Sequence, residues 1–187
     1  MRVGALVLAP GAGSDRNHPA LRAIEAAVAP LPTARIDFPY RKEGRRAPDR
    51  APKLIACVRE EAAVLVAQAR IRPASIALGG RSMGGRMCSM AVAEGLSARA
   101  LVLISYPLHP PGRPDNLRVE HFPELDVPCL FVSGTKDPFG APDELERHAK
   151  AIPGPVTHVW IDGGGHDFKR HDDLVAETIK DWLKALR

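Results

Sequence analysis

Short apolar runs alternate with amphipathic stretches along the whole chain. The runs have the length of buried strands, and we expect strands at residues 3–9, 34–38, 75–79, 100–105, 129–133 and 158–161. Strands that alternate with helical patterns are typical of a parallel sheet with helices on both faces. The pattern therefore predicts a three-layer α/β fold around a mostly parallel six-stranded sheet.

Two of the amphipathic stretches place their apolar residues on one helical face. The first face holds Leu54, Ile55, Val58, Ala62 and Leu65, and the last holds Leu174, Val175, Ile179, Trp182 and Leu186. Asp172 and Asp173 stand where the positive end of the last helix would be. Prolines interrupt residues 106–128, so that only a brief helical piece at residues 117–122 is expected there.

Composition places the chain among globular proteins, because 45% of its 187 residues are hydrophobic and 26% are charged. We expect one domain, residues 1–187, with a core that needs no disulfide or metal. The apolar runs are too short to cross a bilayer, and the N-terminus is interpreted as a first strand rather than a signal peptide. Cys57, Cys88 and Cys129 lie in apolar segments, which favours free thiols and a cytoplasmic location.

Ser82 is the first candidate for chemistry. It lies in Gly80-Arg81-Ser82-Met83-Gly84, directly after an expected strand and before a helical stretch. This Gly-x-Ser-x-Gly pattern can occur by chance, but between a strand and a helix it indicates a nucleophile elbow, a sharp turn that exposes the serine hydroxyl. Free N–H groups at the start of the following helix would point at the same spot.

A serine hydroxyl needs a base and a group that orients the base. His166 follows the last expected strand in a glycine-rich loop, and Asp137 follows the strand expected at residues 129–133. Reactive groups gather beyond the carboxyl ends of strands in open parallel sheets, so we expect Ser82, Asp137 and His166 to meet there. His166 could instead be an exposed loop residue, and Asp137 a turn former or helix cap. Asp162 is the reserve carboxylate.

A tetrahedral intermediate also needs backbone donors for its oxyanion. We assign one donor to Met83, the residue after the nucleophile, and the other to Ala12 in the glycine-rich loop after the first strand, with Gly11 as the neighbouring possibility. That loop lacks both the third glycine of a dinucleotide fingerprint and the Lys-Ser/Thr ending of a P-loop, so nucleotide binding is disfavoured. No cofactor and no metal are expected.

The motifs together resemble the small dienelactone-hydrolase-like branch of the α/β-hydrolases. They are Pro10-Gly11-Ala12-Gly13, Phe38-Pro39-Tyr40, Gly44-Arg45-Arg46-Ala47-Pro48-Asp49, Gly80-Arg81-Ser82-Met83-Gly84-Gly85-Arg86, Gly134-Thr135-Lys136-Asp137-Pro138-Phe139-Gly140 and Gly165-His166-Asp167-Phe168. The resemblance implies Ser82 as nucleophile, Asp137 as acid and His166 as base. Dienelactone hydrolases use a cysteine nucleophile, so the serine argues against copying their substrate.

The resemblance also implies a trimmed sheet in the strand order 2-1-3-4-5-6. Residues 106–128 are too few for a helical lid, so we expect an open site bordered by Tyr40, Tyr106 and His109. Such a site suits a small acyl substrate better than a long lipid chain.

Two functions remain open from the sequence. The first is a serine hydrolase of ester or thioester-like bonds, which acts through an acyl-enzyme. The alternative is a non-catalytic interaction module that uses the basic residues Arg41, Lys42, Arg45, Arg46 and Arg50, within a chain of net charge +4. Nucleic-acid binding is disfavoured because no recognition motif or aromatic stacking platform is visible. No membrane association is expected, and the oligomeric state is left open.

Overall fold

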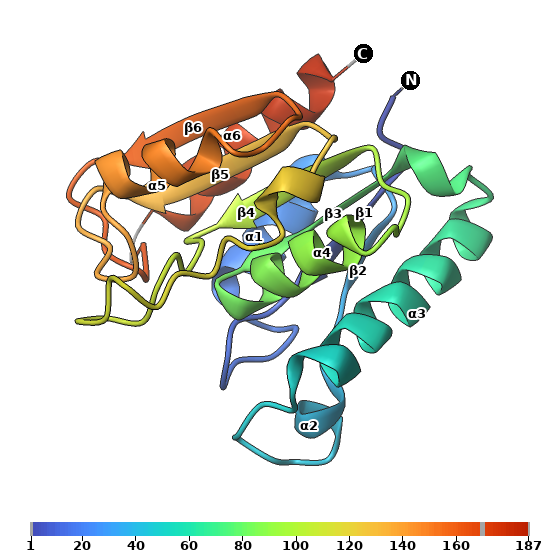
Figure 1. Ribbon diagram of the computed structural model, residues 1–187. Coiled ribbons are helices and arrows are strands. Elements are labelled where there is room, and N and C mark those ends of the chain that lie inside the picture. The colour runs from blue at the N-terminus through green and yellow to red at the C-terminus, as the bar shows by residue number, and fades with distance from the viewer. Residues whose placement is uncertain (1, 169–170, 187) are drawn as a thin grey trace.

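A single parallel sheet forms the centre of the computed structural model, which describes residues 2–168 and 171–186. Its strand order is β2-β1-β3-β4-β5-β6 (Figure 1). The strands are β1 (Ala5–Ala9), β2 (Thr33–Arg35), β3 (Ile76–Arg81), β4 (Ala100–Ile104), β5 (Cys129–Gly134) and β6 (Val156–Ile161). The expected architecture and strand order are confirmed, with every pairing parallel.

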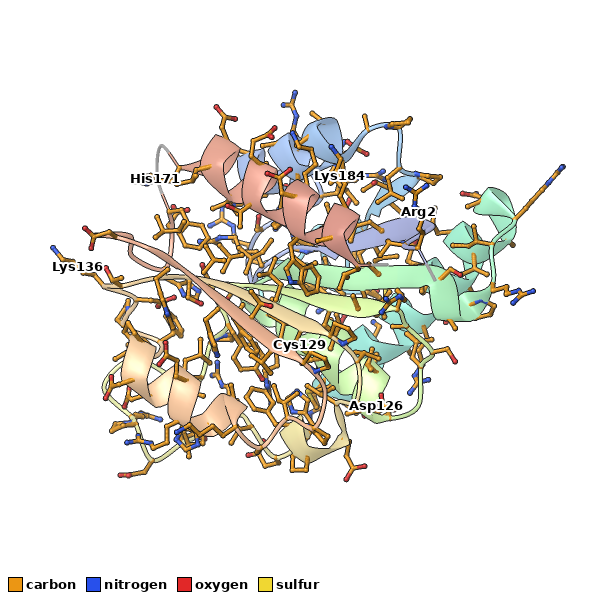
Figure 2. All side chains as sticks on the ribbon, turned by 90° about the horizontal axis from the view of Figure 1, so that it is seen from above. Arg2, Asp126, Cys129, Lys136, His171 and Lys184 are labelled. Carbon is orange, nitrogen blue, oxygen red and sulfur yellow. The ribbon has the colours of Figure 1, made fainter. Side chains whose placement is uncertain are left out.

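Helices cover both faces of this sheet. One face carries α1 (Pro19–Val28) and α6 (Asp172–Ala185). The other carries α2 (Pro39–Lys42), α3 (Ala51–Ala69), α4 (Met83–Ala93) and α5 (Pro142–Ala149), together with the short 3-10 turns η1 (Pro73–Ser75) and η2 (Phe122–Glu124). Figure 2 shows α1 and α6 on one side of the sheet and α5 on the other.

The core is divided between the two faces by the alternation of the strands. Along β1, Val7 belongs to the layer under α3 and α4, whereas Leu6 and Leu8 belong to the layer under α1 and α6. Successive side chains of a strand point to opposite faces, so a continuous apolar run supplies both layers at once. All of β1 is buried for this reason.

The buried face predicted for α3 agrees with the structure, whereas the one predicted for α6 agrees only in part. The five apolar residues predicted for the face of α3 are all buried. The face predicted for α6 is partly wrong, because Leu174 is 53% exposed. The buried residues of α6 are Val175, Ala176, Ile179 and Leu183. Steps of four from Val175 follow one face of a helix, and Leu174 lies outside that face.

Every expected strand differs from the observed strand by one to three residues at one end or both. The strand predicted at residues 34–38 is β2, which ends at Arg35 because the chain soon turns into α2 at Pro39, although Ile36 and Phe38 stay buried. β3 runs on to Arg81, next to the candidate nucleophile. The helical piece expected at residues 117–122 is a 3-10 turn over 122–124 instead.

The connections and helices add two facts about the surroundings of the site. Residues 105–128, which join β4 to β5, carry η2 as their regular element and contain no helical lid in the described chain. Within residues 2–168 and 171–186, no helix is both long and apolar enough to span a membrane.

Candidate active site

The carboxyl ends of the parallel strands bring distant parts of the chain to one edge of the sheet. Ser82 follows β3, and Ala12 lies in the loop after β1. Asp137 and His166 lie in the loops after β5 and β6. Figure 2 shows this edge at Lys136, opposite the end marked by Arg2, which precedes β1.

Ser82 occupies a sharp turn between β3 and α4. Its backbone has φ 51° and ψ −121°, a conformation that L residues rarely adopt. The Ser82 N–H donates to the Ile104 carbonyl at 2.8 Å, and the Arg86 N–H donates to the Ser82 carbonyl at 3.1 Å. The turn is therefore held from β4 on one side and from α4 on the other.

Glycines beside Ser82 allow β1, β3 and α4 to approach one another closely. A Cβ at Gly80 would stand 2.2 Å from the Ala9 carbonyl oxygen, and one at Gly84 would stand 2.3 Å from the same atom. Both clashes are with backbone, which cannot move aside as a side chain can. The two glycines of the Gly-x-Ser-x-Gly pattern are thus required by packing as well as by the turn.

Ser82, His166 and Asp137 form a continuous hydrogen-bonded chain. The Ser82 Oγ lies 2.8 Å from Nε2 of His166, and Nδ1 of His166 lies 2.9 Å from Oδ2 of Asp137. A carboxylate only accepts, so Nδ1 carries the proton in the neutral ring and leaves the Nε2 lone pair facing the hydroxyl. The Asp137 side chain is 2% exposed and that of His166 is 18% exposed, which leaves the imidazole within reach of a substrate.

The other roles considered for Asp137 and Asp162 are also visible. Asp137 accepts a hydrogen bond from the Phe139 N–H at 2.9 Å, so it orders its own turn while it faces His166. Asp162 accepts from the Thr135 hydroxyl at 3.4 Å, a structural contact between the loops after β5 and β6. The carboxylate that meets the imidazole is therefore Asp137.

The loops that carry Asp137 and His166 are packed backbone to backbone. The Lys136 N–H donates to the Gly164 carbonyl at 2.8 Å. A Cβ at Gly134 would stand 2.2 Å from that same carbonyl oxygen. Only glycine at residue 134 permits this approach, and the approach fixes the separation between the carboxylate and the imidazole.

Two side chains with no assigned role in the sequence analysis hold His166 in place. The Phe139 ring stacks on the imidazole with centroids 4.0 Å apart and an interplanar angle of 29°. Arg81 donates to the His166 carbonyl oxygen at 2.9 Å and to the Asp167 carboxylate at 3.3 Å. The sequence signal for both was their position inside the Ser82 and Asp137 motifs.

The loop after β1 runs beside the serine. A Cβ at Gly11 would stand 3.5 Å from the Ser82 Cβ. The Gly13 N–H donates to the Tyr40 hydroxyl at 3.2 Å, whereas the Ala12 N–H has no acceptor within residues 2–168 and 171–186. Met83 is the first residue of α4, where N–H groups lack an intrahelical acceptor. Both residues assigned as oxyanion donors line the same cavity as Ser82.

That cavity has a volume of about 410 Å³. Its walls are Ala12, Arg81, Ser82, Met83, Arg86, Pro107, Arg118, Phe139 and His166. A larger hollow of about 610 Å³ opens at the other edge of the sheet, beside Arg2 and the end of α6, away from these side chains. The cavity at Ser82 is within the usual size range for small-molecule sites.

The border predicted for the site is wrong for all three residues named. Tyr40 is fully buried, and its hydroxyl accepts from Gly13. Tyr106 is 2% exposed and donates to the Arg118 carbonyl at 2.6 Å. His109 is buried against Pro110 and Glu144. The sequence places these residues near strand ends, but it does not reveal the direction of their side chains, none of which lines the cavity at Ser82.

A second serine–histidine pair shows why Ser82 is the better candidate. Ser89 Oγ lies 2.8 Å from Nε2 of His121, the same distance as at Ser82. Ser89 is fully buried, however, and His121 has no carboxylate in hydrogen-bonding contact within the described residues. Burial, followed by the charge of Arg86, lowers the pKa of His121 to about 4. Such a ring is a weak base, and the hydroxyl beside it is buried away from any substrate.

Three of the five basic residues singled out in the sequence are paired with acids, whereas Arg46 and Arg50 are exposed and form no ion pair within residues 2–168 and 171–186. The ion pairs of this segment are Arg41–Asp15, Lys42–Glu61, Arg45–Glu43 and Arg45–Asp49. Hydrogen bonds from Arg45 and Lys53 lower the pKa of the Glu43 carboxyl, so that it stays ionised beside them. The segment is therefore a network of mixed charge, which weakens the case for an interaction surface of uniform positive charge.

The chain matches a known protein family over nearly its whole length. The family model described as "Alpha/beta hydrolase domain" matches residues 2–186. Epoxide hydrolase A of Mycobacterium tuberculosis is 45% identical over 42 residues, which cover 22% of this chain and 13% of that protein. The chain thus spans only a small part of that curated relative.

Solved structures resemble the whole chain. A dienelactone hydrolase from Anabaena variabilis superimposes with a TM-score of 0.78 at 21% identity, over 98% of this chain and 86% of that one. A putative hydrolase of the α/β superfamily from Xanthomonas campestris pv. campestris gives 0.71 at 19% identity, over 99% of both chains. At these identities the likeness concerns the fold.

Proposed function

Because this chain belongs to the α/β-hydrolase family, we propose that it is a serine hydrolase of ester or thioester-like bonds, with Ser82, His166 and Asp137 as its catalytic triad. The observation that carries the proposal is the pair of short contacts on His166, 2.8 Å to the Ser82 hydroxyl and 2.9 Å to the Asp137 carboxylate. Three side chains from three different strand ends meet in the order that acyl transfer needs.

The reaction begins with attack of the Ser82 Oγ on the substrate carbonyl carbon. As the new C–O bond forms, the hydroxyl proton passes to Nε2 of His166, and the buried Asp137 carboxylate stabilises the imidazolium that results. The carbonyl oxygen becomes an oxyanion, which the N–H groups of Ala12 and Met83 would bind. These donors are fixed by the backbone, so they need no rearrangement when the charge develops.

Collapse of this intermediate breaks the bond to the leaving group. His166 gives its proton to the departing oxygen or sulfur, which leaves an acyl-enzyme on Ser82. A water molecule then loses a proton to Nε2 of His166 and attacks the acyl carbon, and the second tetrahedral intermediate releases the acid and restores the serine. The cavity has a volume of about 410 Å³, and residues 105–128, which join β4 to β5, form no helical lid over it in the described chain. Both features suit a short acyl group and a small-molecule substrate.

Active-site-directed labelling tests the proposal before any substrate is known. A fluorophosphonate probe should label the wild-type chain at Ser82, and Ser82→Ala should abolish both the labelling and any ester turnover, with a loss of at least about 10⁴-fold in kcat. Ser97→Ala is the matched control, because Ser97 is an exposed hydroxyl on the loop beyond α4. Undiminished labelling of Ser82→Ala would end the proposal.

Asp137→Asn separates the triad from a serine that is reactive for other reasons. The amide can still contact Nδ1 of His166 but cannot stabilise an imidazolium, so kcat should fall by about 10³- to 10⁴-fold. Turnover within a few fold of the wild type would show that the carboxylate contact is structural only.

A further inference from the structure

Arginines at three positions line the cavity beside Ser82: Arg81, Arg86 and Arg118. The guanidinium of Arg81 is already engaged, since it donates to the His166 carbonyl and to Asp167. The other two differ from it. Within residues 2–168 and 171–186, neither Arg86 nor Arg118 forms a side-chain hydrogen bond or an ion pair, and both side chains are only partly exposed.

Both side chains are partly buried, which makes the lack of a partner costly. Nε of Arg86 is buried and unsatisfied. Burial, followed by the charge of Arg86, lowers the pKa of Arg118. An arginine nevertheless remains protonated in proteins, so two positive charges share one wall of the cavity without an acid between them. A desolvated charge without a counter-ion is a destabilising arrangement unless a ligand completes it.

The surroundings of the pair are neutral. His121 is uncharged at neutral pH because its pKa is about 4, and the Tyr106 phenol is buried. The Glu120 side chain lies close enough to influence the pKa of both groups, but it is exposed and forms no ion pair with either arginine among the described residues. The protein itself thus supplies no carboxylate to the two guanidinium groups.

The backbone holds both arginines in fixed positions. Arg86 lies in the first turn of α4, where its N–H donates to the Ser82 carbonyl at 3.1 Å, so it stands one turn from the nucleophile. The Arg118 N–H donates to the Leu108 carbonyl at 2.9 Å, and the Arg118 carbonyl accepts from the Tyr106 hydroxyl at 2.6 Å. Both backbone polar groups of Arg118 are therefore hydrogen-bonded, although the residue lies in a loop. Such preorganisation is typical of a recognition site.

We propose that Arg86 and Arg118 form an anion-binding subsite next to Ser82, and that the substrate carries a negatively charged group, such as a carboxylate, within a few bonds of its scissile carbonyl. The proposal rests on the function proposed above for its reaction. An anion seated there neutralises both guanidinium groups and satisfies the buried Nε of Arg86. The small cavity places that anion close to the reacting carbon, so binding would also orient the ester for attack.

Matched ester pairs measure the preference. On the acyl side, the half-ester 4-nitrophenyl hydrogen glutarate is compared with 4-nitrophenyl valerate, which lacks the carboxylate. On the leaving-group side, 4-acetoxybenzoate is compared with its methyl ester. We expect at least one charged ester to exceed its neutral counterpart in kcat/KM by at least about tenfold, with a preference that weakens as salt is added.

The variants Arg118→Gln and Arg86→Gln should each remove most of that preference, while fluorophosphonate labelling of Ser82 and turnover of the neutral ester change little. Arg118→Lys should keep part of it, because the charge remains and the planar fork is lost. Arg113→Gln is the control, since Arg113 is an exposed arginine of the same connection. Circular dichroism shows whether each variant is folded. If Arg86→Gln, the variant in α4, is unstable, the result for Arg118→Gln alone tests the proposal.

Binding without turnover separates this proposal from the proposed reaction. Ser82→Ala is titrated by calorimetry with the half-anilide glutaranilic acid and with its methyl ester, and we expect the acid to bind at least about tenfold more tightly, unless Arg118→Gln is also present. If Ser82 is not labelled but this difference persists, the hydrolase proposal falls and the anion subsite stands. If Ser82 is labelled but neither charged ester is preferred and the anilides bind equally, the subsite is refuted. Equal loss for charged and neutral esters in Arg118→Gln also refutes it.

Discussion

The conformation of Ser82 is the most constrained feature at the scale of single residues. A non-glycine residue in this region of φ and ψ costs on the order of 1 to 3 kcal/mol, which the surrounding structure must offset. Hydrogen bonds through the Ile104 carbonyl and the Arg86 N–H fix the turn, so the hydroxyl is presented to His166 without a search among conformations. The strain therefore contributes to positioning the nucleophile.

Phe139 is a positioning residue for the proposed base. Its ring stacks on the imidazole of His166 and would lie against the imidazolium that forms during the reaction. Phe139→Ala should lower kcat for a neutral ester by about 3- to 30-fold, the equivalent of about 0.7 to 2 kcal/mol, with a smaller change in KM. Phe139→Tyr should restore most of the rate. A tyrosine variant as slow as the alanine variant would contradict this role.

His121 makes stability depend on pH. Its folded-state pKa of about 4 lies below the ordinary value of 6.5, because the ring is buried beside Ser89 and near Arg86. Below pH 6.5 the unfolded chain therefore binds a proton that the folded chain does not. The stabilisation is fully present above pH 6.5, is lost as the pH falls towards 4, and levels off below that.

The measurement for His121 is urea unfolding at several pH values. Between pH 7 and pH 4.5 this histidine should account for a fall on the order of 2 kcal/mol in the free energy of unfolding. His121→Gln keeps a hydrogen-bonding group opposite Ser89 but does not titrate, so the fall should be smaller by that amount. Equal pH dependence of the free energy of unfolding in the variant and the wild type would show that folding does not lower the pKa of His121.

The positions of candidate residues could be predicted where a strand end and a short motif coincide. Ser82, Asp137 and His166 come together as expected because parallel strands deliver their carboxyl ends to one edge. The direction of a side chain that follows a strand depends on loop packing, which the sequence does not encode locally. For that reason Tyr106 was misplaced at the border of the site, and Arg118, whose backbone Tyr106 holds, was missed.

At the scale of elements, close approach of backbones determines the geometry of the site. β1, β3 and α4 meet at Gly80 and Gly84, and the loops after β5 and β6 meet at Gly134 and Gly164. A sequence predicts that glycine permits a turn, but not which carbonyl lies opposite it. The packing role of these glycines therefore emerges only from the assembled sheet.

Gly84→Ala tests this packing. The new Cβ would stand 2.3 Å from the Ala9 carbonyl oxygen and 2.6 Å from that of Pro10, so α4 must move away from the loop that carries Ala12. We expect the free energy of unfolding in urea to fall by about 2 kcal/mol or more, with loss of fluorophosphonate labelling. Gly165→Ala is the control, because the nearest atom to its Cβ would be 4.0 Å away. Similar stability of the two variants would refute the packing argument.

The whole molecule follows from the order of its apolar runs, because each buried strand supplies two hydrophobic layers and each crossover adds a helix to one of them. The pattern of apolar runs therefore predicted the parallel sheet, and the family resemblance predicted its strand order, even where boundaries moved by a few residues. The layer under α3 and α4 also contains three free cysteines from distant parts of the chain: Cys57 in α3, Cys88 in α4 and Cys129 in β5.

These thiols report on the cooperativity of that layer. Burial raises the pKa of Cys57 to about 11 and those of Cys88 and Cys129 to about 12. At pH 8 the fraction present as thiolate is then about 10⁻³ or less in the folded state, and the sulfurs are also shielded from reagents. Ellman's reagent should therefore detect almost no thiol in the native protein and all three in guanidinium chloride. Near the unfolding midpoint, all three should react in one phase at a common rate, because α3, α4 and β5 share one core. Early reaction of Cys57 alone would show instead that α3 detaches while the sheet stays folded.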